Sequence, residues 1–84
     1  MKRFKKKLYK RVSIDPGISS IGVYRIYKEN IEFFLVVFEY KAWSVPLGEG
    51  YTPWGAVAKA TLSPIVKDNK RLQQALAILE KVII

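Results

Sequence analysis

The stretch Ile31-Glu-Phe-Phe-Leu-Val-Val-Phe-Glu-Tyr40 decides the fold of this 84-residue chain. Its residues are mostly β-branched, aromatic or otherwise apolar, which favours a strand. Successive strand side chains point to opposite faces. The apolar residues therefore form two sets: Ile31, Phe33, Leu35 and Val37 on one face, and Phe34, Val36, Phe38 and Tyr40 on the other. Because both faces are apolar, we expect this strand to be covered on both sides.

Two further strands are predicted before this one. The polar segment Lys28-Glu29-Asn30 suits a hairpin connection, and Ile18 to Tyr27 has β character. Asp15-Pro16-Gly17 breaks the run, because Pro and Gly are strong turn signals. Before it, Leu8 to Ile14 alternates, with these apolar residues on one side: Leu8, Val12 and Ile14. The pattern predicts a three-stranded antiparallel β-meander over residues 8–40.

The residues after Tyr40 predict a loop and then a short helix. Residues 41–52 contain one Pro and two Gly, which is typical of a loop. Thr52-Pro53 resembles a helix start, with Thr as the N-cap and Pro in the first turn. The helix is expected from Trp54 to Leu62. We also expect Trp43 and Trp54 to lie in the core of so small a domain, the alternative being an exposed aromatic platform.

A second helix is predicted at the C-terminal end of the sequence. Asp68 or Asn69 can cap it, and its apolar residues recur with a helical period at Leu72, Ala75, Leu76, Leu79, Val82 and Ile83. The predicted fold class is α+β: a three-stranded antiparallel meander, a C-terminal amphipathic helix packed on it, and a short intervening helix.

The charge is concentrated at the N-terminus. The chain has 15 Lys and Arg against seven Asp and Glu, a formal net charge of +8. Residues 1–11 hold seven bases and no acid, whereas residues 12–84 hold eight bases and seven acids. We therefore divide the chain into a basic N-terminal arm, residues 1–11, and a single small α+β domain, residues 12–84.

The composition excludes several classes of chemistry. There is no Cys and no His, which rules out disulfides, thiolate or imidazole metal sites and a Ser-His-Asp triad. A bound metal would be a hard cation such as Mg²⁺, held by oxygen ligands. The longest apolar run has six residues, from Phe33 to Phe38, against about 20 for a membrane-spanning helix. We expect an intracellular protein, cytoplasmic or in a virion, that is not secreted.

The basic arm is the first candidate binding site. Its cations are Lys2, Arg3, Lys5, Lys6, Lys7, Lys10 and Arg11. Beside Phe4 and Tyr9, they suit contacts with nucleic-acid phosphates and stacking on unpaired bases. Two alternatives remain open. One is a solvated tail, and the other is an anionic partner such as a membrane surface, with Phe4 and Leu8 as shallow anchors.

Asp15 is the candidate catalytic and metal-binding residue. In isolation, Asp-Pro-Gly is most often a simple β-turn. However, Val12-Ser13-Ile14-Asp15-Pro16-Gly17 followed by Gly22 resembles the opening of RuvC-type Holliday-junction resolvases, nucleases of the RNase H-like fold. Residues 70–84 look like the first long helix of that family. The resemblance implies that Asp15 is the first catalytic carboxylate and a Mg²⁺ ligand. Residues 41–69 have no counterpart in it.

The same resemblance indicates binding without cleavage. The family's other catalytic acids come after the long helix, and this sequence ends at that helix. We therefore predict a nucleic-acid-binding protein that resembles the front half of a resolvase and is not catalytic alone. If it is an enzyme, it is a Mg²⁺-dependent endonuclease, for instance one completed by homo-oligomerisation. The alternative is a structural or assembly subunit of a virion or ribonucleoprotein particle that completes its fold against partners.

Overall fold

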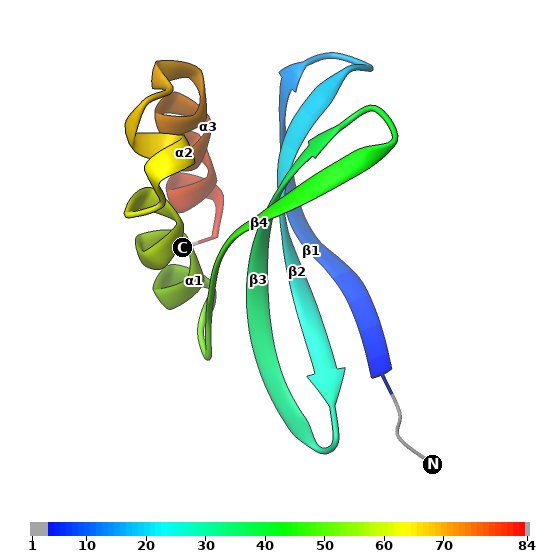
Figure 1. Ribbon diagram of the computed structural model, residues 1–84. Helices are drawn as coiled ribbons and strands as arrows, with labels where there is room; N and C mark the ends of the chain where they lie inside the picture. Colours follow the sequence, from blue (N-terminus) through cyan, green and yellow to red (C-terminus); the bar gives the residue numbers. More distant parts are fainter. Residues whose placement is uncertain (1–3, 84) are drawn as a thin grey trace.

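The computed structural model describes residues 4–83. An antiparallel sheet is followed by helices (Figure 1). The strands are β1 (Phe4–Asp15), β2 (Ser19–Lys28), β3 (Ile31–Tyr40) and β4 (Trp43–Gly50). The helices are α1 (Pro53–Thr61), α2 (Pro64–Lys67) and α3 (Lys70–Val82). The fold class is therefore α+β, with four strands and three helices in the described part of the chain.

The sheet is a meander in the order β1-β2-β3-β4, in which each strand pairs antiparallel with the next. The β2–β3 hairpin has a two-residue turn at Glu29 and Asn30, with φ angles of 51° and 67°. Two successive residues with positive φ match the right-handed twist of the strands. All three helices lie on one side of the sheet, and the β2–β3 hairpin extends past them (Figure 1).

The prediction of three strands and a loop over residues 41–52 is wrong, because Trp43–Gly50 forms the fourth strand. Gly48 and Gly50 are needed there for packing. A Cβ at Gly48 would lie 2.5 Å from the backbone N of Ala60 in α1, and one at Gly50 would lie 2.8 Å from the backbone N of Ala56. Pro46 lies on an edge strand beside the register shift between Val36 and Val37, and edge strands and bulges are the places at which a sheet accepts Pro.

The first strand begins earlier than expected. Residues 4–11 of the expected basic arm are the first part of β1 and pair with β2. A register shift between Leu8 and Lys10 marks a bulge at Tyr9. As a result, Leu8 pairs with Tyr24 and Val12 pairs with Ile21, so these two residues lie on opposite faces rather than on one.

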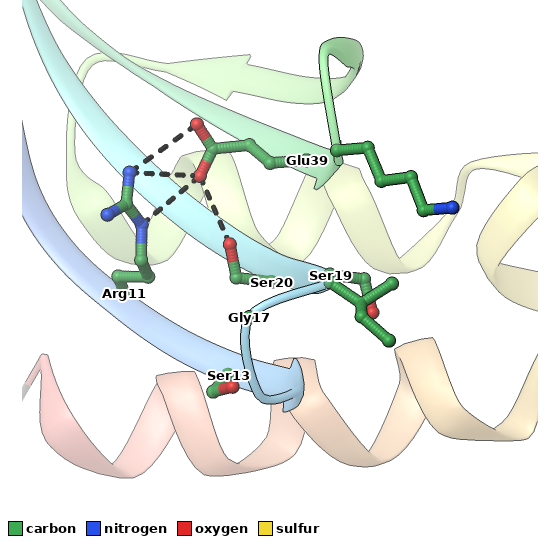
Figure 2. Close-up of a pocket in the computed structure, with 8 residues that line it drawn as sticks. Arg11, Ser13, Gly17, Ser19, Ser20 and Glu39 are labelled. Carbon is green, nitrogen blue, oxygen red and sulfur yellow. Dashed lines mark hydrogen bonds and ion pairs between the residues drawn. The ribbon is translucent and has the colours of Figure 1, made fainter.

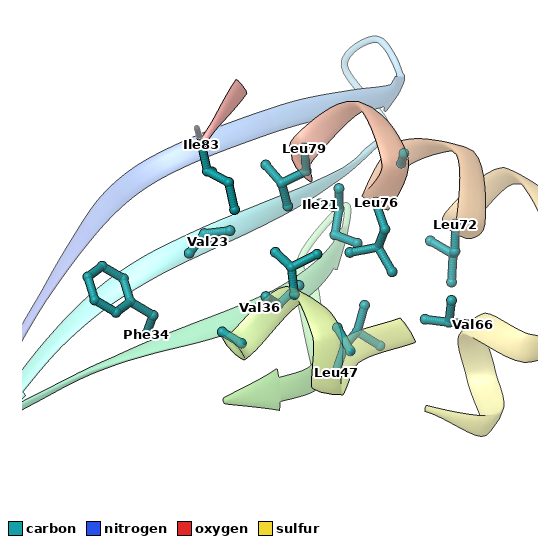
Figure 3. Close-up of a cluster of buried hydrophobic side chains, with 14 residues drawn as sticks. Ile21, Val23, Phe34, Val36, Leu47, Val66, Leu72, Leu76, Leu79 and Ile83 are labelled. Atoms are coloured by element: carbon teal, nitrogen blue, oxygen red, sulfur yellow. The ribbon is translucent and has the colours of Figure 1, made fainter. Parts of the chain in front are cut away.

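The main core lies between the sheet and the helices (Figure 3). Ile21 and Val23 of β2 and Val36 of β3 are fully buried there against helical residues such as Leu76 and Leu79. Both predicted helices are present, although α1 begins at Pro53 rather than at Trp54, and α2 is a short helix that the sequence did not predict. The Thr52 side chain accepts a hydrogen bond from the Gly55 N–H, and that of Asn69 accepts from the N–H groups of Arg71 and Leu72.

The helices cover only one face of the sheet. The opposite face carries a smaller buried cluster of Tyr24, Ile26 and Val37, with Phe33 and Leu35 packed against it. The Lys6 side chain lies over the Tyr24 ring, and no second layer of helices or strands covers this cluster among residues 4–83. The expectation that β3 is covered on both faces is therefore correct for the face under the helices. It is wrong for the opposite face, which no helix or strand of residues 4–83 covers. We call the face that carries Tyr24, Ile26 and Val37 the open face.

Two further expectations concern the tryptophans and membrane-spanning helices. The two tryptophans do not lie in the core: Trp43 is 61% and Trp54 50% exposed. Among the described residues, no helix is long and apolar enough to cross a membrane.

Candidate nucleic-acid interface

The cations of β1 line the outer strand of the sheet. We call Lys5, Lys6, Lys7, Lys10 and Arg11 the basic edge; all five are exposed. β1 pairs only with β2, so its other side carries backbone groups with no strand partner among residues 4–83. Lys2 and Arg3, also predicted to bind nucleic acid, lie outside the described residues. The expected cationic site is thus in part an ordered strand.

The strand register distributes these cations to both faces. Lys6 pairs with Ile26 and Arg11 with Gly22, which places both on the open face. Lys5 pairs with Tyr27 and Lys7 with Arg25, which places them on the face that carries the helices, at the end the helices do not cover. Residues two apart on a strand are about 6.6 Å apart. The basic edge therefore consists of two groups of charges, Lys5 to Lys7 and Lys10 with Arg11, which are separated by the bulge at Tyr9.

Few acids neutralise these charges. No ion pair joins Lys5, Lys7 or Lys10 to another residue within the described range. Arg11, by contrast, pairs with Glu39 of β3 at 3.1 Å. The neighbouring Arg25 of β2 pairs with Glu32. Three lysines of the basic edge therefore keep their charge available to an anionic partner.

Aromatic rings lie among these charges. The Lys6 Nζ lies 4.3 Å from the centre of the Tyr24 ring, within the range of a cation–π contact. Tyr9, at the bulge, packs edge-on against Phe34 with ring centres 5.5 Å apart. Tyr9 and Tyr27 remain partly exposed. Exposed rings between lysines are the combination used to bind unpaired nucleotides.

A polar network crosses the open face next to the basic edge (Figure 2). The Glu39 carboxylate accepts hydrogen bonds from Arg11, from the Ser20 hydroxyl at 3.3 Å and from the Tyr24 hydroxyl. Arg11 also donates to the Tyr24 oxygen at 2.8 Å. Burial, followed by the hydrogen bond to Glu39, raises the pKa of Tyr24. The hydrogen bond to Tyr24 is the main cause that raises the pKa of Arg11.

A hollow of about 370 Å³ opens beside this network. Its lining includes the hydroxyls of Ser13 and Ser20 and the cations Arg11 and Lys41, together with Glu39. Figure 2 shows Glu39 directed at Arg11 and Ser20. Glu39 is the one acid of this lining, and its oxygens are occupied by the network. The hollow is thus polar, with a small excess of positive charge.

Asp15 lies at the end of β1, as the sequence indicates, where its carboxylate contacts other side chains of the chain. Its carboxylate pairs with Arg71 of α3 and accepts a hydrogen bond from the Ser19 hydroxyl at 3.3 Å. The Arg71 contact is the main cause that lowers the pKa of Asp15. No group of three or more acidic side chains that could hold a metal occurs within residues 4–83. One carboxylate beside a guanidinium does not fit a two-metal nuclease site.

Comparison with known proteins found no matching family model, no matching curated protein and no matching solved structure. Sequence reasoning found the basic residues and Asp15. It missed Glu39 and Lys41, which lie at the same end of the open face as Tyr24. No sequence signal joins them, since the strand register alone makes them neighbours.

Proposed function

We propose that the protein binds nucleic acid through the basic edge. The observation that carries the proposal is the row of exposed lysines on the outermost strand, of which Lys5, Lys7 and Lys10 have no acidic partner among the described residues. Lysine side chains that contact phosphates displace counterions, which drives binding without regard to nucleotide sequence. Tyr9 and Tyr27 add surfaces on which bases can stack.

The resemblance to the opening of RuvC-type resolvases is compatible with this role. In that family a strand ending in Asp-Pro-Gly opens an RNase H-like fold. We propose that this chain is related to the N-terminal half of that fold. The pairing of Asp15 with Arg71 favours binding without cleavage, because the carboxylate is already neutralised by a cation of its own chain. In this proposal Asp15 stabilises the end of the sheet on which the basic edge lies.

The test is the salt dependence of binding. Fluorescence anisotropy with labelled single-stranded and duplex oligonucleotides gives the affinity at several salt concentrations. We expect a steep dependence, with a slope of about −0.7 per contacted phosphate on single strands. Replacing Lys5 and Lys7 together by Ala should make the slope shallower by about 1.4.

A matched control separates the basic edge from overall charge. Replacing Lys59 and Lys67 by Ala removes the same two charges from α1 and α2, which lie away from β1. This control should bind almost as tightly as the original chain. The proposal fails if neither oligonucleotide binds at low salt, or if the control variant loses as much affinity as the β1 variant.

A second candidate is an assembly subunit, and the unpaired side of β1 favours it. A free edge strand can accept a strand from another chain. Lysines on the edge oppose pairing with a second copy of β1, since like charges would face each other. Sedimentation analysis of the purified chain tests this role. A single monomeric species supports the independent binding module, whereas a stable oligomer supports assembly.

A further inference from the structure

The turn between β3 and β4 carries an aromatic pair, of which Tyr40 is half-buried and Trp43 is exposed. Tyr40 and Trp43 are directly opposite each other across the hairpin, with ring centres 5.7 Å apart. Phe38 continues the row, with its ring centre 6.4 Å from that of Tyr40. Phe38 packs against the main core, but Trp43 is 61% exposed. The row thus begins in the core and ends in a ring that is open to solvent.

This turn is held in place. The Lys41 N–H donates a hydrogen bond to the Ile18 carbonyl in the β1–β2 turn at 2.9 Å. Lys41 itself has a φ of 51°, so the chain reverses within two residues between Tyr40 and Trp43. A ring fixed by its neighbours loses little conformational entropy when a ligand binds. Trp43 is therefore an exposed and preorganised contact.

Positive charge lies beside the rings. The Lys41 Nζ is 5.5 Å from the centre of the Tyr40 ring. Its side chain also lines the hollow that contains Arg11 and the hydroxyls of Ser13 and Ser20. Glu39, the acid of that hollow, already accepts from Arg11, Ser20 and Tyr24. A ligand with a flat ring and a nearby negative charge matches this surface.

We propose that Trp43 stacks on an unpaired base and that Lys41 contacts the adjacent phosphate, so that the preferred ligand is a single strand. This inference rests on the proposed nucleic-acid binding and narrows it. In a duplex the base faces are stacked on one another, so Trp43 can reach them only in single strands. Lys41 and Arg11, the last residue of the basic edge, line the same hollow, so the proposed site lies next to the basic edge.

The two tryptophans give a direct test. Trp54→Phe leaves Trp43 as the one tryptophan, and Trp43→Phe leaves Trp54, which lies on α1. Each variant is titrated at low salt with a single-stranded thymidine oligonucleotide and with a duplex of equal length, while anisotropy reports binding independently. We expect single strands to quench the fluorescence of Trp43 and to leave that of Trp54 almost unchanged.

Affinity gives the second measurement. Base–aromatic stacking corresponds to at least about a fivefold effect on affinity. Trp43→Ala, which removes the ring altogether, should therefore weaken single-strand binding by about fivefold or more and leave duplex binding unchanged. Lys41→Ala should make the salt slope on single strands shallower by about 0.7. The side chains of Trp43 and Lys41 are both exposed. Trp54→Phe retains both of them, so its quenching does not depend on whether the Trp43 and Lys41 variants are stable.

The outcomes separate this inference from the proposed function. Binding by anisotropy without quenching of Trp43 would overturn the inference and leave the basic edge as the binding surface. Equal losses on single strands and duplexes in Trp43→Ala would overturn the preference for single strands. Absence of binding to either oligonucleotide at low salt would overturn both proposals, and would favour a protein partner for the aromatic pair.

Discussion

Arg71, the second residue of α3, forms an ion pair with Asp15, the last residue of β1, across 56 positions of sequence. Arg71 also lies 3.5 Å from the Ile14 carbonyl oxygen. The pair connects the start of the helix to the end of the outermost strand, next to the Asp-Pro-Gly turn. The residue that most resembles a nuclease carboxylate is therefore engaged in holding helix and sheet together.

Replacing Asp15 by Asn should lower stability at neutral pH and have less effect in acid. The folded-state pKa of Asp15 is lowered, mainly by Arg71, so the unfolded chain takes up the proton first as the pH falls. The contribution is full above the unfolded pKa of 3.8 and is lost as the pH falls through the folded pKa. Urea unfolding midpoints of both proteins, measured from about pH 7 down to about pH 2, test this.

Glu80→Gln is the matched control for Asp15, because it removes the same charge from the exposed side of α3. It should leave the midpoint almost unchanged. A difference between Asp15→Asn and the original chain that stays constant over the whole pH range would contradict the ion-pair explanation.

Asn69→Ala should destabilise the protein by about 0.5–2 kcal/mol. The Asn69 side chain accepts hydrogen bonds from the N–H groups of Arg71 and Leu72 at 3.0 and 3.2 Å, and Ala would leave both donors to water. Chemical denaturation measures the loss. Gln74→Ala, on the exposed side of the same helix, is expected to change stability by no more than about 0.5 kcal/mol. Equal effects of the two substitutions would refute the capping role.

Much of this fold could be predicted from local patterns. The β3 strand was predicted with its observed bounds, because ten consecutive residues with β character end at polar turns. The N-cap of α1 was recognised at Thr52 and that of α3 was narrowed to Asp68 or Asn69, since such side chains accept hydrogen bonds from backbone donors at a helix start. These features depend on residues close together in the sequence, which is why the sequence reveals them.

The features that were missed depend on distant neighbours. Gly48 and Gly50 look like loop residues until α1 is seen packed against β4. The bulge at Tyr9, which sends Leu8 and Val12 to opposite faces, has no signal in the alternation itself. For the site, the sequence located Asp15 but could not reveal that Arg71 pairs with it. Trp43 was expected in the core because apolar residues usually are, yet its position at a hairpin end exposes it.

Gly48→Ala should cost about 1–3 kcal/mol, the usual range for overpacking. The added Cβ would lie 2.5 Å from the Ala60 N and 2.9 Å from its Cα, both backbone atoms of α1, so helix and strand must move apart. Gly17→Asn is a contrasting control. Gly17 has a φ of 76° and no atom within 4 Å of a Cβ placed there, and Asn tolerates that conformation. Thermal melting of the two variants should therefore differ clearly, and similar melting temperatures would show that α1 does not pack closely on β4.

Tyr24 should make the protein sensitive to alkali. Its folded-state pKa is raised above 10.0, first by burial and then by the hydrogen bond to Glu39. As the pH rises past 10.0, the unfolded chain loses the Tyr24 proton first. This contribution to stability is therefore full below the unfolded pKa and is lost as the pH rises through the folded pKa.

Tyr24→Phe keeps the ring beneath Lys6 and removes the hydroxyl, so the stability of this variant should fall less steeply above about pH 10. Urea unfolding of both proteins between about pH 8 and pH 11 measures the difference. Tyr27→Phe, which removes an exposed hydroxyl from the same strand, should behave like the original chain, and parallel pH profiles for Tyr24→Phe and the original chain would contradict the role given to the buried hydroxyl.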